Sequence, residues 1–264
     1  MSIKLVSVNI ERDKHLDRVI PFIQSEKPDV LCVQELNEKN IPLFVATMKS
    51  RSHKFSPMLR HIKEPGLPAI GVGIFSRLPV RSFGEHYYLG NPDIVPEIDH
   101  DMLPTDWESP ANGALLSAEI VRHTSTFRVA TTHFTWSPRG EVTNRQRQDV
   151  RAMLDTTLPL GELIFAGDFN APRGGEIFSF INDHYHDAIP ARYKTSLDIS
   201  LHRAGKERPE ELADKMVDGL FLTPGYHASG VRLERGVSDH CAIVARIHIA
   251  GERRLFNWWD ILRW

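Results

Sequence analysis

Short apolar segments that end in a carboxylate or another polar side chain constrain the fold of this chain more than any other feature. Residues 30–35 read VLCVQE, and residues 163–170 read LIFAGDFN. Unbroken apolar runs of this length are typical of strands that are buried on both faces. Three segments with helical apolar spacing lie between such runs, at residues 13–29, 40–50 and 141–158. We therefore expect an α/β protein.

The remaining strand candidates extend this pattern along the whole chain. Alternating or short apolar segments predict strands near residues 3–10, 71–80, 114–122, 126–134, 216–224 and 240–249. Two strand-rich halves that each carry helices would pack their sheets face to face and cover the outer faces with helices. We expect a single domain over residues 1–250, followed by an aromatic tail at 251–264.

Composition excludes several classes of protein. The formal net charge is −2, so the 264-residue chain lacks the basic excess of a protein that coats nucleic acid. The sequence has no apolar run long enough to span a bilayer and no secretory signal at its N-terminus. Cys32 and Cys241 lie in apolar runs, where buried thiols are expected. These features predict a cytoplasmic protein, with a monomer favoured.

Carboxylate, amide and imidazole side chains gather at the predicted strand ends, where open sheets place their ligand sites. They are Asn9, Glu35, His133, Asp168, Asn170, Asp218, Asp239 and His240. Carboxylates combined with amides and few cysteines suit a hard cation such as Mg²⁺ better than zinc. The sequence therefore predicts a magnesium site, with Mn²⁺ as a substitute.

The order of these segments resembles the endonuclease/exonuclease/phosphatase superfamily. The resemblance rests on SVNIER, LCVQE, GIFSRLPV, TTHFTW, AGDFN, MVDGLFL and VSDH, which cover nearly the whole chain. It implies a four-layer α/β/β/α sandwich of two packed, mainly antiparallel sheets, and a metal-dependent phosphoric ester hydrolase. The histidine of TTHFTW is similar to the deoxyribonuclease, tyrosyl-DNA phosphodiesterase and sphingomyelinase-like branches rather than the abasic-site endonuclease branch.

The resemblance also implies the metal ligands. Glu35 would be the main Mg²⁺ ligand, with Asn9 beside it and Asp239 near the ion. Glu11 stands where several nucleases place an aspartate near the metal, whereas others have arginine or glycine there. Its assignment stays open.

The implied catalytic roles fall on five residues. Asp168 would orient or deprotonate the attacking water, and Asn170 would bind the scissile phosphate. His240 would contact a non-bridging phosphate oxygen as an imidazolium, with Asp218 raising its pKa. His133 would assist the leaving oxygen.

Taken singly, several of these residues have simpler explanations. A lone histidine such as His133 most often caps a strand end, and Asp218-Gly219 is an ordinary turn pair. Asn9 and Asn170 are common turn or cap residues. The order of the motifs favours the functional interpretation, while Arg145 and Gln148 are assigned to a structural helix face.

The substrate is less constrained than the chemistry. A nuclease or DNA-end phosphodiesterase is the first candidate, hydrolysis of lipid or small-molecule phosphoesters the second, and a non-catalytic binding module the third. Residues 87–110, with two tyrosines and a tryptophan, are expected to form a loop that shapes the substrate pocket. The Trp-rich tail suits base stacking or a membrane interface, but docking on the domain is favoured.

Overall fold

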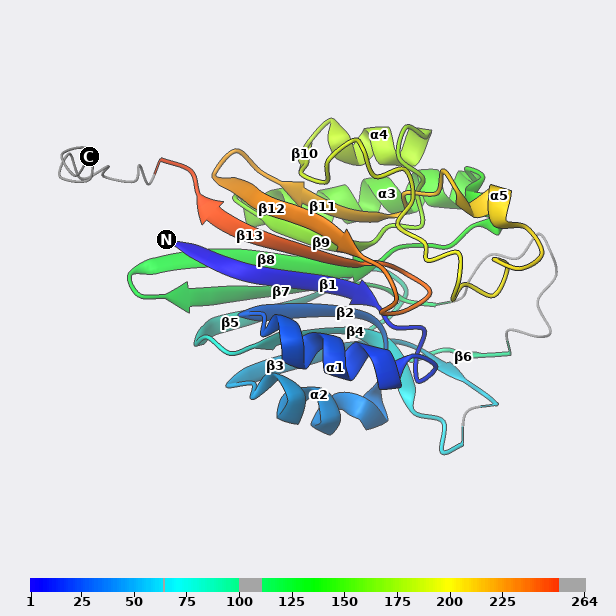
Figure 1. Ribbon diagram of the computed structural model, residues 1–264, viewed down its shortest axis with the longest axis horizontal. Coiled ribbons are helices and arrows are strands. Elements are labelled where there is room, and N and C mark those ends of the chain that lie inside the picture. Colours follow the sequence, from blue (N-terminus) through cyan, green and yellow to red (C-terminus); the bar gives the residue numbers. More distant parts are fainter. Residues whose placement is uncertain (64, 100–110, 252–264) are drawn as a thin grey trace, which may run out of the picture.

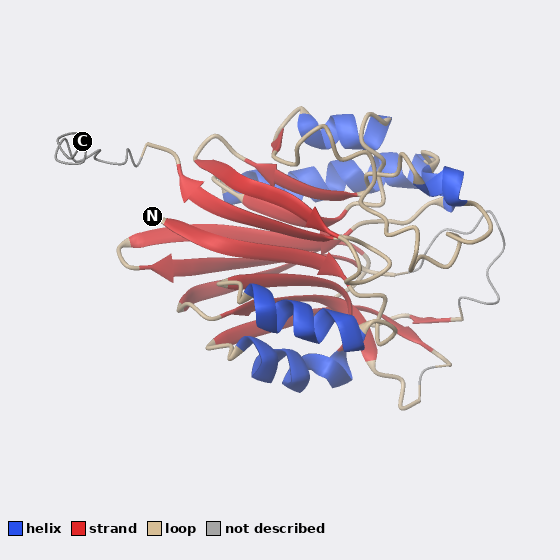
Figure 2. Cartoon of the chain, viewed as in Figure 1, coloured by secondary structure: helices blue, strands red, loops and turns tan. Residues whose placement is uncertain are grey.

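The strands form two mixed sheets that pack face to face (Figures 1 and 2). The structure is a computed structural model, which describes residues 1–63, 65–99 and 111–251. The first sheet has the order β12 (Tyr226–Glu234), β13 (Ala242–Ile249), β1 (Ser2–Asn9), β2 (Val30–Asn37), β4 (Ala69–Ser76), β3 (Ser52–His61) and β6 (Glu97–Ile98). The second has the order β10 (His186–Asp187), β11 (Asp218–Leu222), β9 (Ile164–Asp168), β8 (Ser125–His133), β7 (Gly113–Arg122) and β5 (Val80–Leu89).

Helices cover the outer face of each sheet, so the expected four-layer sandwich is confirmed (Figure 2). Helices α1 (Leu16–Glu26) and α2 (Ile41–Met48) lie on the first sheet, while α3 (Asn144–Thr157) and α4 (Glu176–Asn182) lie on the second. A short helix, α5 (Pro209–Leu212), sits in the connection before β11. None of the helices in the described ranges is long and apolar enough to cross a membrane.

Three buried apolar clusters separate these layers. The central cluster joins the inner faces of both sheets, for example Ile3 and Val72 with Leu116 and Val129. A second cluster lies between the second sheet and α3 and α4, and a third between the first sheet and α1 and α2. Strands such as β4 and β9 are buried along their entire length because both of their faces meet one of these clusters.

Parallel strand pairs bring several strand ends to one rim of the sandwich. β1 runs parallel to β2, and β8 runs parallel to β9 with His133 paired to Asp168. The antiparallel partner β11 begins at this rim, since Asp218 pairs with Asp168. In Figure 1 this rim is the end of the sandwich opposite the N-terminus.

The structure adds elements that the sequence pattern does not predict, chiefly β3 and β12. β12 is an edge strand and β3 lies next to the edge, so their side chains are mostly half-buried and lack a clear alternation. The expected loop from residue 87 is also shorter at its start, because β5 continues through Tyr88 to Leu89. Trp107 lies outside the described residues, as does the aromatic tail from residue 252.

Candidate active site

A buried amide links two carboxylates at the rim. Asn9, the last residue of β1, donates its side-chain amide to Glu35 Oε1 at 3.2 Å and to Asp168 Oδ2 at 3.0 Å. Its Oδ1 accepts the backbone N–H of Glu11 at 3.0 Å. Asn9 therefore holds a carboxylate from each sheet in one place.

The expectation that Glu35 ends its strand is wrong, because β2 continues for two residues to Asn37. Glu35 has a φ of 53°, and the pairing of β2 with β4 shifts register between Val33 and Leu36. A bulge of this kind re-aims one side chain without ending the strand. The preceding Gln34 crosses between the sheets and donates to Thr131 Oγ1 at 2.8 Å.

Asp168 is the centre of the site. Its Oδ2 lies 3.5 Å from His133 Nε2 and 3.8 Å from His240 Nε2, in addition to its bond with Asn9. Its Oδ1 accepts the backbone N–H of Asn170 at 2.9 Å. The side chain is almost fully buried, so these donors surround a carboxylate that has little contact with water.

His240 and Asp218 form a buried pair. The His240 Nδ1 lies 2.7 Å from Asp218 Oδ2. Burial disfavours the charged ring, but the carboxylates of Asp218 and Asp168 outweigh it and hold the pKa of His240 well above its usual value. An imidazolium with Nε2 facing the rim is therefore the stable form at neutral pH.

Asp239 belongs to a group of side chains that could bind a metal ion. Ligand atoms of Glu11, His15 and Asp239 lie within 4.8 Å of one another. Burial raises the pKa of Asp239 to about 6, with the charges of Glu11 and Glu35 acting in the same direction against the opposing effect of His240. Like charges crowded in a buried place are stabilised by a cation. Glu11, whose assignment the sequence left open, is a member of this group.

This donor set fits a hard divalent cation. Asn9 donates to the Glu35 carboxylate, and the charges of Glu11 and Glu35 act on the carboxylate of Asp239. Oxygen ligands of this kind are those that Mg²⁺ and Mn²⁺ prefer. His15 was not predicted, since its only sequence signal is its helical spacing from Glu11. Its Nε2 lies 3.1 Å from Glu11 Oε2.

Hydrogen bonds hold the loop that carries Asn170 in place. It adopts a φ of 47° two residues after the end of β9, and its side-chain amide donates to Phe134 O at 2.8 Å. Gln146 of α3 donates to Thr135 O at 2.8 Å, and Arg145 pairs with the buried Asp149 at 2.8 Å. Arg145 thus makes the structural contact expected of it.

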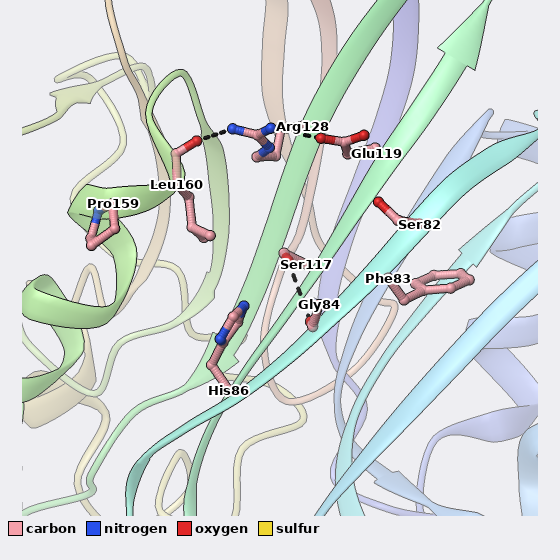
Figure 3. Close-up of a pocket in the computed structure, with 9 residues that line it drawn as sticks. All are labelled: Ser82, Phe83, Gly84, His86, Ser117, Glu119, Arg128, Pro159 and Leu160. Atoms are coloured by element: carbon pink, nitrogen blue, oxygen red, sulfur yellow. Dashed lines mark hydrogen bonds and ion pairs between the residues drawn. The ribbon is translucent and has the colours of Figure 1, made fainter.

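One hollow of the described surface lies away from this rim. A hollow of about 240 Å³ lies on the second sheet and is lined by Ser82, Phe83, Gly84, His86, Ser117, Glu119, Arg128, Pro159 and Leu160 (Figure 3). Its arginine is already engaged by the Leu160 carbonyl and by Glu119. Arg128 is also five residues before His133 along β8, about 16 Å at the usual rise of a strand. This hollow is separate from the rim that holds His133 and Asp168.

The sequence and the fold both match known proteins. A model of the endonuclease/exonuclease/phosphatase family matches residues 6–240. A search of curated proteins gives no significant match. The structure is similar to an endonuclease/exonuclease/phosphatase from Beutenbergia cavernae, with a TM-score of 0.71, 18% identity, and coverage of 94% of this chain and 72% of that one.

Two further solved structures share the fold. One is a mannosyl-6-phosphatase from Bacteroides thetaiotaomicron, with a TM-score of 0.66, 12% identity, and coverage of 94% of this chain and 100% of that one. The other is the human Nocturnin catalytic domain with bound sulfate, with a TM-score of 0.66, 15% identity, and coverage of 94% and 93%. At these identities the likeness concerns the fold.

Proposed function

The chain belongs to the endonuclease/exonuclease/phosphatase family, and we propose that it is a Mg²⁺-dependent phosphodiester hydrolase that uses an in-line water. One observation carries the proposal: Asp168 Oδ2 lies 3.5 Å from Nε2 of His133, at the end of β8, and 3.8 Å from Nε2 of His240, in the loop before β13. A buried carboxylate between two imidazoles, next to a crowded oxygen-ligand group, supplies the parts that phosphoryl transfer requires.

The protein's own groups divide the reaction between them. Asp168 orients the attacking water and accepts its proton as the new oxygen–phosphorus bond forms. His240, as imidazolium, donates to a non-bridging oxygen, and Asn170 donates its second amide hydrogen to the same phosphate. His133 stabilises the leaving oxygen as the ester bond breaks. Each proton-transfer group of this kind is typically worth ~10²- to 10⁴-fold in rate.

A bound Mg²⁺ would neutralise charge on the phosphate oxygens. Glu35 and Asp239 would hold the ion, with Asn9 beside them. The hydrogen bonds of Asn9 to Glu35 and Asp168 fix the spacing between the metal side and the water side of the site. Asn9 thereby couples the two halves of the reaction.

A nuclease or DNA-end phosphodiesterase remains the first candidate, because the histidine of TTHFTW resembles that of the deoxyribonuclease and tyrosyl-DNA phosphodiesterase branches. A second candidate, a phosphatase or phosphodiesterase of small molecules or lipids, is favoured by the net charge of −2. A fold relative named as a mannosyl-6-phosphatase also favours it. Mg²⁺-dependent rates on single- and double-stranded DNA, bis-p-nitrophenyl phosphate, phosphoinositides and sugar phosphates separate the two.

Removal of divalent cations is expected to abolish activity on every substrate of this panel. The carboxylates of the site repel one another and the substrate phosphate without an ion. Excess chelator followed by dialysis, and then titration with Mg²⁺ or Mn²⁺, checks this result. Undiminished turnover after exhaustive chelation would contradict the mechanism.

Glu35→Gln is expected to weaken Mg²⁺ binding by about tenfold or more while leaving the fold intact. The exchange is nearly isosteric and keeps an oxygen that accepts from Asn9, but it removes the charge. Titration calorimetry with Mg²⁺ measures the change, and the exposed Glu210→Gln is the matched control. An unchanged Mg²⁺ affinity would remove Glu35 from the metal site.

A further inference from the structure

A segment that sequence reasoning left unassigned lies against the catalytic loop. Leu197 forms an antiparallel bridge with His240. The backbone N–H of Asp198 donates to Asp239 O at 2.8 Å, and that of Cys241 donates to Ser196 O at 2.7 Å. The segment therefore follows the loop of Asp239 and His240 as an extra strand would, and its position is tied to these two residues.

Directly after this contact the chain closes into a tight turn. The N–H groups of Leu201 and His202 both donate to Asp198 O. The Asp198 carboxylate accepts from Ser200 N at 3.0 Å and from Gly236 N at 2.6 Å. A Cβ on Gly205 would lie 1.7 Å from Ile199 O. The turn is thus packed tightly enough to fix the backbone of His202.

The tautomer of His202 follows from this geometry. Its Nδ1 accepts the backbone N–H of Ala204 at 3.1 Å, so Nδ1 carries no proton. A neutral imidazole has one N–H, which must then be on Nε2. None of the described residues accepts a hydrogen bond from this Nε2, and the ring is half-buried.

Charges of the active site act on this ring. Burial, together with the positive charges of His240, Arg203 and Lys14, lowers the pKa of His202 to about 4 against the opposing effect of Glu11. His240 belongs to the loop that pairs with this segment, and Glu11 and Lys14 follow β1, so charges from both sides of the rim act on the ring. A neutral donor beside the metal group and an imidazolium suits an anionic oxygen.

We propose that His202 is a substrate-contacting residue, whose Nε2–H donates to a non-bridging oxygen of the phosphate ester alongside His240. This inference rests on the proposed function. The ring supplies a directed donor without adding a further charge to a region that already holds the Lys14 ammonium and the His240 imidazolium. Loss of a hydrogen bond to a charged group is expected to weaken binding by about 10- to 100-fold.

Two substitutions separate substrate contact from support of the turn. His202→Ala removes both ring nitrogens. His202→Asn keeps an acceptor near the Nδ1 position for the Ala204 N–H but has no group that reaches the Nε2 position. Both are expected to weaken binding of inorganic phosphate, measured by calorimetry in the presence of Mg²⁺, and to raise KM for bis-p-nitrophenyl phosphate. The Mg²⁺ affinity and thermal midpoint of His202→Asn should match the wild type.

Controls distinguish the possible outcomes. His184→Ala, on an exposed histidine, should bind phosphate as the wild type does. Loss of phosphate binding in the alanine variant but not in the asparagine variant would assign the histidine to the turn and overturn the proposal. Wild-type protein that binds no phosphate overturns it as well. Phosphate binding that depends on His202 in a protein without hydrolase activity supports the contact and rejects the proposed function alone.

Discussion

Asp168→Asn is expected to lower kcat by about 10²- to 10⁴-fold, the range for loss of a general base. The amide is close in size to the carboxylate and keeps one oxygen for Asn9 or the Asn170 N–H. It cannot accept the proton of the attacking water, and it removes the negative charge between His133 and His240. The measurement is single-turnover hydrolysis of bis-p-nitrophenyl phosphate at saturating Mg²⁺.

The matched control is Asp155→Asn, an exposed aspartate of α3. It should retain the wild-type rate, and Asp168→Asn should keep the wild-type circular dichroism spectrum. A folded Asp168→Asn variant that turns over within a factor of three of the wild type would remove Asp168 from the chemistry. In that case the attacking water must be activated elsewhere in the site.

Asp218→Asn is expected to lower the maximum rate and to move the alkaline limb of the pH profile to lower pH. Activity requires protonated His240, so it is present below the pKa of His240 and is lost as the pH rises through that value. The charge of Asp218, 2.7 Å from the ring, raises this pKa. Removing a neighbouring opposite charge lowers such a pKa by about one to three units, and the alkaline limb should move by that amount.

The profile of kcat/KM against pH for both forms tests this prediction. Asp214→Asn changes an exposed aspartate four residues earlier and should leave the limb in place. Because Ser196 Oγ accepts the Asp218 backbone N–H at 3.0 Å, the backbone of the variant should keep its position. An alkaline limb that stays unmoved in Asp218→Asn would show that the two side chains do not act as a pair.

Much of the fold could be predicted from local pattern. The buried strands β2, β4 and β9 are apolar throughout because both of their faces are covered, and the helices α1, α2 and α3 show their buried stripe. The expected burial of Cys32 and Cys241 is confirmed. Strands β3 and β12 lie at or near sheet edges, and their mixed exposure leaves no clear period to read.

The candidate site also contains residues that the local sequence predicts and residues that only the tertiary structure places. Asn9, His133 and Asp168 each end a strand as predicted, because an apolar run followed by a polar residue marks that point locally. The bulge at Glu35 depends on the pairing of β2 with β4, which no single segment contains. Ser196 and Leu197 have no pattern of their own, since only the antiparallel contact with the loop of Asp239 and His240 places them at the rim.

The sequence by itself determined the chemical inventory and the layer order of this protein, because side-chain type and apolar spacing are properties of each segment. Only the tertiary structure decided the distances between the side chains of the candidate site. Asn9 and Asp168 are 159 positions apart, yet their side chains lie 3.0 Å from each other, because the two sheets pack face to face with β1 and β9 in contact and ending at the same rim. The tertiary structure also decided the protonation of His240, because burial and the carboxylates of Asp218 and Asp168 together set its charge.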